Sequence, residues 1–248
     1  MEHSALGGRP GPVALVGSGE YLPAMADLEG GLLAGRPPVF VQLATAAVPD
    51  GPEVVERWHR LGAEQAARLG VEQVVLPVAS RADADDPAIA SLLDGAGLIY
   101  LSGGNPHFLA ETLRDTLVWR SIVAAWQAGS ALAGCSAGAM VMAARIPSWR
   151  HPRQGDETGL GLLPHVRTIP HFDTFFGRIP DRLARMLIPD DPALAVIGVD
   201  ELTAIVGGPT SWTVRGAGSA WLLDAHERSE LAAGTTFTVT AGPTVTRV

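Results

Sequence analysis

The stretch SALAGCSAGAM at residues 130–140 tells most about the fold of this 248-residue chain. Its first half is small and apolar, as a buried strand requires, and GCSAG at 134–138 matches the G-x-S-x-G pattern of a nucleophile elbow. In such an elbow a tight turn from strand to helix raises a serine hydroxyl above the edge of a sheet. Gly134 and Gly138 remove side chains that would collide across the turn. We therefore predict a strand, an elbow and a helix, with Ser136 as a nucleophile.

Apolar runs of similar length recur along the chain, and the first ones alternate with helix-like stretches. Alternation of this kind predicts a parallel sheet with crossover helices. The expected strands lie at 13–19, 38–47, 72–79, 97–104 and 130–136, and the expected helices at 52–70, 86–95 and 106–127. Asp86 as N-cap and Pro87 as first helical residue mark the start of the second helix.

The composition and the spacing of apolar residues change after about residue 145. A stretch rich in proline, glycine and charge at 146–164 predicts a long loop. A short helix is expected at 178–187, and closely spaced strands, typical of antiparallel pairing, at 196–208, 211–216, 219–224 and 235–248. We expect one α/β domain over 1–248, a three-layer sandwich with a mostly parallel central sheet and an antiparallel C-terminal strand extension.

The composition excludes several classes of chemistry. All 18 basic residues are arginine, which excludes a P-loop and a Schiff-base or pyridoxal-phosphate mechanism, since these need lysine. A net charge of −8 argues against binding to nucleic acid, which requires clustered positive charge to neutralise phosphates. Neither a signal peptide nor a membrane-spanning run is visible, and the single cysteine cannot form an internal disulfide. We expect a cytoplasmic protein with no metal, cofactor, membrane or nucleic-acid partner; whether it forms a homodimer stays open.

A second candidate segment is LSGGNPHF at 101–108, at the carboxyl end of an expected parallel strand, where open α/β sheets bind ligands. The amides of Gly104 and of Ala137, the residue after the elbow serine, are candidates for an oxyanion hole. Asn105 would orient the substrate or the loop, so Asn105→Ala is expected to lower turnover with little effect on stability. The plainer alternative is a flexible strand-to-helix turn.

A nucleophilic serine needs a base and an orienting acid. Among the seven histidines, His171 in TIPHFD stands beside apolar residues that would shield a base from bulk water. The other six are His3, His59, His107, His151, His165 and His226. Two carboxylates, Asp200 and Glu201, interrupt the apolar run VIGVDELTAIV and would point to opposite faces of an extended strand. We assign Glu201 to His171.

Three other interpretations belong beside this one. Cys135 would be a better nucleophile as a thiolate, but its side chain should point into the sheet, away from Ser136, as a small buried hydrophobe. An esterase of the α/β-hydrolase type would use Ser136 with Asp200 and His226. A non-catalytic binding domain is the third alternative, and it predicts a Ser136–His171 distance beyond a few ångströms.

The segments LSGGNPHF, GCSAGA, IPHF and GVDELTAIV, in this order, resemble the dipeptidase E and cyanophycinase family of serine peptidases. The resemblance spans roughly 12–225 and leaves 226–248 as a C-terminal β extension. It implies the class I glutamine amidotransferase-like fold and a triad of Ser136, His171 and Glu201. It also implies that the oxyanion amides belong to Gly104 and Ala137.

The resemblance is mixed at the level of the subfamily. Pro170 before the histidine is similar to dipeptidase E, whose members cleave after an N-terminal aspartate, but RIPSWRHP at 145–152 lacks the acid of that branch. The glutamate strand is similar to cyanophycinases, which cut a β-aspartyl-arginine polymer to dipeptides. The sequence therefore predicts a serine peptidase acting on small aspartyl or β-aspartyl peptides, with Arg178 or Arg182 as the group that binds a substrate carboxylate.

Overall fold

The structure is a computed structural model. It describes residues 9–147, 156–176, 191, 194–223, 228–239 and 245–247. The predicted short helix at 178–187 lies outside the described residues, and so do His3, His151 and His226.

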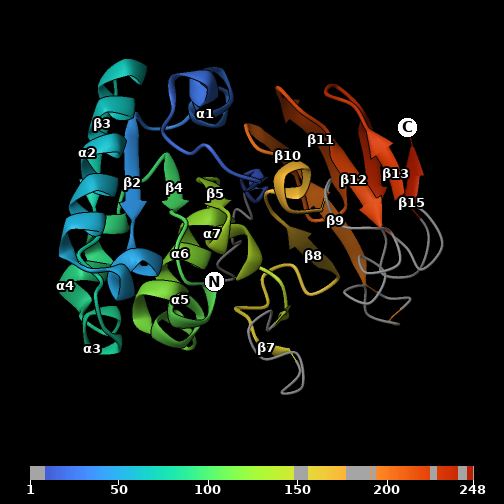
Figure 1. The fold of residues 1–248 in the computed structure, drawn as a ribbon. Coiled ribbons are helices and arrows are strands. Elements are labelled where there is room, and N and C mark those ends of the chain that lie inside the picture. The colour runs from blue at the N-terminus through green and yellow to red at the C-terminus, as the bar shows by residue number, and fades with distance from the viewer. Residues whose placement is uncertain are drawn as a thin grey trace, which may run out of the picture.

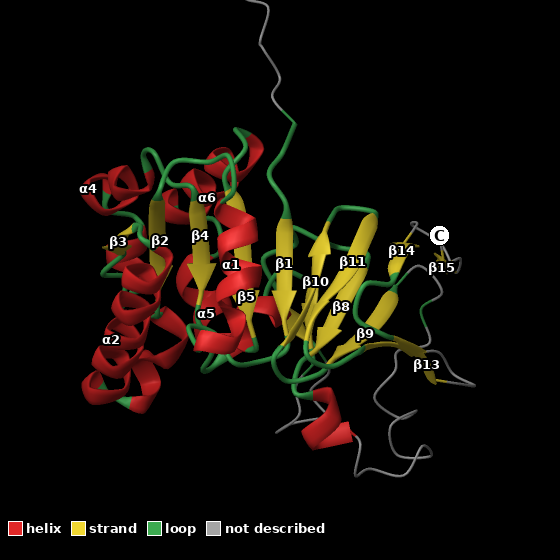
Figure 2. Cartoon of the chain, turned by 90° about the horizontal axis from the view of Figure 1, so that it is seen from above, coloured by secondary structure: helices red, strands yellow, loops and turns green. Residues whose placement is uncertain are grey.

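A large central sheet runs through the molecule in the order β15-β14-β11-β10-β1-β5-β4-β2-β3. Its parallel half consists of β1 (Val13–Val16), β2 (Val39–Leu43), β3 (Glu72–Val75), β4 (Leu98–Leu101) and β5 (Ala131–Cys135). Its antiparallel half consists of β10 (Thr203–Gly207), β11 (Ser211–Gly216), β14 (Thr236–Val239) and β15 (Val245–Arg247). Figure 1 shows the two halves side by side, and Figure 2 shows β1 and β10 meeting between them.

Helices cover both faces of the parallel half, which is why its strands are apolar throughout. One face packs against α1 (Ala26–Leu33) and α2 (Pro52–Leu69), which lie together in Figure 2. The other face packs against α5 (Pro106–Leu113) and α6 (Leu117–Gln127). Shorter helical segments complete the layers: η1 (Pro23–Met25), η2 (Thr45–Asp50), α3 (Arg81–Ala84), α4 (Pro87–Ala90), η3 (Ser91–Leu93) and α7 (Ala137–Met140). The predicted α/β class with a large central sheet between helices is confirmed.

A second, smaller sheet was not predicted. It has the order β13-β12-β9-β8, with β8 (Val166–Ile169), β9 (Ala195–Val199), β12 (Ala220–Leu223) and β13 (Arg228–Leu231). Strands β8 and β9 are parallel, and the other neighbours are antiparallel. The run at 196–208 is therefore two strands, because the chain leaves the small sheet at β9, turns at 200–202 and enters the large sheet as β10.

Two further boundaries differ from the sequence-based expectation. The expected strand at 38–47 ends at Leu43, and the chain continues as the helical turn η2. The expected helix at 106–127 is interrupted, because Asp115 has a positive φ of 62° and the Thr116 side chain caps a new helix. The Asp86 cap is confirmed, since its carboxylate accepts a hydrogen bond from the Ala88 amide at 2.7 Å.

The predicted loop at 146–164 is more ordered than expected where the structure describes it. Near its start, β6 (Arg145–Ile146) pairs antiparallel with β7 (Glu157–Thr158). Ile146 is fully buried, and Leu163 beyond β7 is almost so. Glu157 lies 2.9 Å from Nδ1 of His107 at the start of α5. No helix among the described residues is long and apolar enough to cross a membrane.

Candidate active site

Ser136 stands at a sharp turn between β5 and α7. Its backbone has φ 50° and ψ −109°, a strained conformation for a residue with a side chain. A Cβ atom at Gly134 would lie 2.3 Å from the Gly138 carbonyl oxygen, and one at Gly138 would lie 2.2 Å from the Leu101 oxygen. Both glycines are therefore required by close backbone approach, as the sequence predicted for a nucleophile elbow.

Two backbone amides border the elbow. Ala137 is the first residue of α7, and its N–H points out of the helix end, where no carbonyl of that helix can accept it. Gly104 has φ 138°, and a Cβ there would lie 2.3 Å from the Ala46 carbonyl oxygen. Neither N–H has an acceptor within the described part of the chain. These are the two amides that the sequence assigned to an oxyanion hole.

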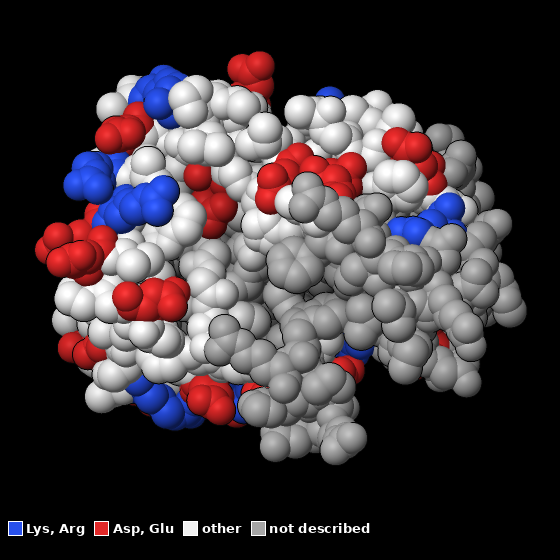
Figure 3. Space-filling model, in the orientation of Figure 1, with Lys and Arg blue, Asp and Glu red and all other residues white. Residues whose placement is uncertain are grey.

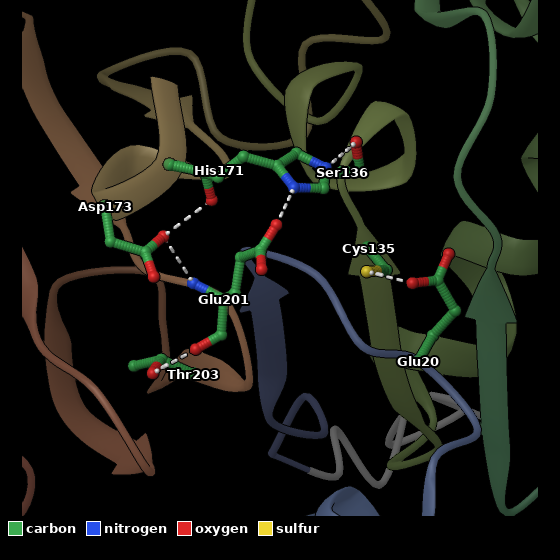
Figure 4. A network of polar contacts seen from close by, with 8 residues as sticks. Glu20, Cys135, Ser136, His171, Asp173, Glu201 and Thr203 are labelled. Atoms are coloured by element: carbon green, nitrogen blue, oxygen red, sulfur yellow. Dashed lines mark hydrogen bonds and ion pairs between the residues drawn. The ribbon is translucent and has the colours of Figure 1, made fainter. Parts of the chain in front are cut away.

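A chain of hydrogen bonds leads away from the serine. His171 Nε2 lies 3.2 Å from Ser136 Oγ, and His171 Nδ1 lies 2.9 Å from Glu201 Oε1. Figure 4 shows the three side chains in this order. The imidazole keeps 33% of its surface exposed and the glutamate 43%, so the expected shielding from water is only partial. The structure brings together all three residues of the predicted triad.

Strand register explains how residues far apart in sequence meet here. In the parallel pair β8–β9, Ile169 lies opposite Gly198, so His171 and Asp200 follow at matching positions beyond the two strands. The turn after β9 then meets the end of β1, where the Leu202 amide donates to the Ser18 carbonyl oxygen at 3.2 Å. This places Glu201 at the corner between the two sheets, beside the imidazole.

The reasoning from an extended strand was wrong for Asp200 and Glu201, because both lie in the turn between β9 and β10. Asp200 is buried, and its carboxylate accepts hydrogen bonds from the Ser219 amide at 3.0 Å and from the Trp221 indole at 2.9 Å. Burial raises the pKa of Asp200, while these two hydrogen bonds oppose the rise. Its carboxylate is therefore committed to the small sheet, and His226, its partner in the esterase alternative, lies outside the described residues.

Of the two residues that follow His171, Phe172 was expected only as an apolar neighbour of the imidazole, and Asp173 was missed in the sequence. Phe172 is buried against Trp221, and its ring fills the space beside Gly198, where a Cβ would lie 2.4 Å from a ring carbon. The Asp173 carboxylate accepts a hydrogen bond from the Glu201 amide at 3.0 Å. The segment HFD therefore supplies the imidazole, an apolar anchor and a contact that holds the turn of Glu201. The apolar Phe172 beside a histidine was the available signal.

Cys135 lies on the other side of β5 from Ser136, as expected, and is fully buried. It is not simply a small hydrophobe, because its Sγ lies 2.7 Å from Oε2 of the buried Glu20. Burial raises the pKa of the Cys135 thiol well above its usual value, and the Glu20 carboxylate raises it further. The thiol is therefore protonated at neutral pH, which argues against a thiolate nucleophile.

Asn105 is the N-cap residue of α5. Its side-chain oxygen accepts hydrogen bonds from the amides of His107 at 3.0 Å and Phe108 at 3.1 Å, which caps α5. Of its two expected roles, orienting the loop is the one that this geometry supports. In place of the expected small effect of Asn105→Ala on stability, this cap predicts a loss of about 1 kcal/mol.

Other candidates stay untested by this geometry. Arg178 and Arg182 lie outside the described residues. Within the described residues, no group of three His, Cys, Asp or Glu side chains is arranged to hold a metal ion. Figure 3 shows one group of acidic side chains above the middle of this face and further acidic side chains along the left edge, where arginine side chains lie among them.

The fold and the elbow with its neighbouring histidine and glutamate define an α/β protein of the nucleophile-elbow class. The model of Peptidase family S51 matches residues 22–210, and the chain belongs to this family. A crystal structure of a peptidase from an acI-B1 Actinobacterium is 44% identical, with a TM-score of 0.85, over 94% of this chain and 98% of that one.

More distant relatives agree with this placement. A cyanophycinase from Synechococcus elongatus is 32% identical over 173 residues, which are 65% of this chain and 52% of that protein. A cyanophycinase from Trichormus variabilis is 28% identical over 78% of this chain and 66% of its own length. The chain thus spans about half to two thirds of the curated relatives it matches. A structure assigned to peptidase E from Listeria monocytogenes is 17% identical with a TM-score of 0.58, over 91% of this chain and all of that one, and shows a shared fold.

Proposed function

We propose that the protein is a serine peptidase in which Ser136 is the nucleophile, His171 the general base and Glu201 the acid that orients the imidazole. The observation that carries this proposal is the hydrogen-bonded chain from Ser136 Oγ through His171 to Glu201, at 3.2 and 2.9 Å. A nucleophile, a base and an orienting group within hydrogen-bond reach are the requirements of this chemistry. The short Ser136–His171 distance also argues against a non-catalytic domain.

The proposed reaction has two halves. Ser136 Oγ attacks the scissile carbonyl carbon while its proton passes to His171 Nε2, and the resulting oxyanion accepts hydrogen bonds from the Gly104 and Ala137 amides. The C–N bond then breaks, and His171 gives the proton to the leaving amine, which leaves an acyl ester on Ser136. Water attacks this ester with His171 again as base, which releases the acid product and restores the serine. Throughout, the Glu201 carboxylate accepts a hydrogen bond from the His171 Nδ1–H and is not itself protonated.

The proposed substrates are small aspartyl or β-aspartyl peptides. Family membership and the likeness to cyanophycinases support this class. The proposal that Arg178 or Arg182 binds the substrate carboxylate rests on sequence alone. A comparison of hydrolysis rates for aspartyl dipeptides and β-aspartyl-arginine distinguishes the two substrate types.

Labelling with a serine-reactive fluorophosphonate, followed by peptide mapping, tests the nucleophile. We expect one adduct, on Ser136, and none in Ser136→Ala. An adduct on Cys135, or no adduct on a protein whose circular dichroism shows an intact fold, would overturn the proposal. His226→Ala provides the test of the esterase alternative, because it should retain activity that His171→Ala loses.

A further inference from the structure

A buried carboxyl group with no assigned role lies directly beneath the elbow. Glu20 follows β1 in the segment GSGE at 17–20, and only 5% of its surface is exposed. Its Oε1 accepts a hydrogen bond from the Gly103 amide at 2.9 Å, and its Oε2 lies 2.7 Å from the Cys135 Sγ. Burying a carboxylate is costly unless its oxygens are hydrogen-bonded, and here each oxygen has one partner.

Each partner of Glu20 lies one or two residues before a proposed oxyanion donor. Gly103 immediately precedes Gly104, and Cys135 is separated from Ala137 only by the nucleophile. One carboxyl group therefore connects the two backbone segments that carry the proposed oxyanion donors. It reaches them from the far side of β5, so it contacts neither the serine hydroxyl nor the space above it (Figure 4).

The fit around Gly103 shows how closely these segments approach. A Cβ at Gly103 would lie 2.9 Å from Glu20 Oε1 and 3.4 Å from the Ser136 Cβ. The loop after β4 is thus held between the carboxyl group and the nucleophile. Since the Gly103 N–H is bound by Glu20, the loop can present the next amide, that of Gly104, toward the serine.

A second buried carboxyl group in the same layer provides a contrast. Glu29 on α1 is fully buried, but its oxygens accept hydrogen bonds from the Tyr21 amide at 3.3 Å and from Gln65 Nε2 at 2.5 Å. None of these contacts involves β5 or the loop after β4. The two glutamates therefore share burial and a carboxyl group, but of the two only Glu20 contacts the residue before the elbow serine and the loop after β4.

We infer that Glu20 is a positioning residue for the oxyanion hole, which holds Gly103 and Cys135 so that the amides of Gly104 and Ala137 converge on one oxygen. This inference rests on the proposed peptidase function. An oxyanion hole stabilises the transition state more than the bound substrate, so its misplacement lowers kcat and leaves KM nearly unchanged. A merely structural glutamate would instead change stability without this separation of kcat from KM.

Glu20→Gln preserves the shape of the side chain but replaces one of its two accepting oxygens by a donor. We expect kcat to fall about 10- to 100-fold and KM to change by less than about 2-fold, since loss of a whole oxyanion donor costs about 10²- to 10³-fold. The rate of fluorophosphonate labelling at Ser136 should fall by a similar factor. Glu29→Gln is the matched control, and we expect it to keep the wild-type kcat and labelling rate.

A second pair of variants covers the case in which Glu20→Gln does not fold. Cys135→Ala removes one contact of the carboxyl group, whereas Cys135→Ser retains a donor at that place. We expect Cys135→Ala to lower kcat about 3- to 10-fold more than Cys135→Ser does. Equal kcat values for these two variants would contradict the inference.

The Gly103 amide provides a readout that needs no substrate. Its proton resonance should move upfield in Glu20→Gln and stay in place in Glu29→Gln, because an amide bound to a carboxylate is strongly deshielded. A wild-type labelling rate in Glu20→Gln, or an equal fall in Glu29→Gln, would overturn the inference while leaving the peptidase intact. A wild-type protein that neither hydrolyses peptides nor takes the label would instead overturn the proposed function, and the positioning role with it.

Discussion

The two sides of the candidate active site are built in different ways. The parallel half of the large sheet supplies Ser136 and the two amides from two tight backbone turns, one after β4 and one after β5, and each turn contains its own pair of glycines. The small sheet and the corner that joins it to β10 supply His171 and Glu201, which are 30 residues apart. The first side is fixed by close contacts between backbone atoms, while the second is partly open and is held by contacts between side chains.

Because of this difference, substitutions should affect the two sides in different ways. On the elbow side, adding a single methyl group to Gly134 or Gly138 would place it against backbone atoms that have no room to move. On the imidazole side, the important contacts join side chains, such as Phe172 beside Gly198 and Asp173 with the Glu201 amide. Substitutions there should disturb catalysis through the position of His171 and leave the elbow in place.

The largest expected effect tests whether the two sides work as one unit. Ser136→Ala and His171→Ala should each lower kcat by about 10⁵-fold or more, because neither the nucleophile nor the base functions without the other. The double variant should be no slower than either single variant, as measured by kcat on the best peptide substrate. Multiplicative losses in the double variant would show that the two sides act independently.

Gly198→Ala disturbs only the imidazole side. The new methyl group would lie 2.4 Å from the Phe172 ring, so we expect about 1–3 kcal/mol of destabilisation and a fall in kcat of about 10-fold or more, since the ring anchors His171. Urea unfolding and steady-state kinetics measure the two effects. Gly31→Ala on α1 is the control. A Cβ atom at this position would have no neighbouring atom within 4 Å, so this variant should keep full activity. Unchanged kinetics in Gly198→Ala would show that Phe172 does not position the histidine.

The buried Glu29, on α1 beside the parallel half of the large sheet, should make the stability of the protein depend on pH. Burial raises the pKa of Glu29 from 4.5 to about 7, so between these values the folded state binds more protons than the unfolded state. Stability should therefore fall as pH rises from about 4.5 to 7, by about 3 kcal/mol in all. Glu29→Gln should remove this slope and be the more stable protein at pH 8. Unfolding in urea at pH 5 and pH 8 measures it, and equal slopes in both proteins would mean that this layer is hydrated.

The smallest expected effect concerns the loop after β4, which lies on the elbow side. Asn105→Ala removes the cap of α5 and should lower the free energy of unfolding by about 1 kcal/mol. Asn105→Asp keeps an acceptor at the same place and should retain most of this stability in thermal unfolding. If both variants are equally destabilised, the amide group of Asn105 has a partner that the cap does not explain.

The elbow was the most predictable part of the molecule. Its glycines, its serine and the apolar strand before it stand within one short stretch, so local rules were sufficient. Glu201 was placed beside His171 for an incorrect reason, because the run at 196–208 contains a turn between two sheets rather than one strand. The small sheet itself was missed, since pairing between β8, β9, β12 and β13 leaves no local mark that identifies its partners.

The position of Glu20 beneath the elbow could not be predicted from the sequence. In the sequence, GSGE lacks the third glycine of a dinucleotide fingerprint and offers no other signal. Its partners, Gly103 and Cys135, lie 83 and 115 residues away. Only the parallel order of β1, β5 and β4 brings the ends of these strands together and gives the carboxyl group its neighbours.

The sequence by itself determined the α/β class, the elbow at Ser136 and the helix that begins after Asn105, because these depend on apolar periodicity and on residue types within a few positions. The tertiary structure decided which carboxylate faces His171, which one faces the small sheet and which one lies beneath the elbow. The physical reason is that a carboxylate is oriented by the donors it meets. In this protein those donors are brought to it by strand register and by the crossing of the chain between two sheets.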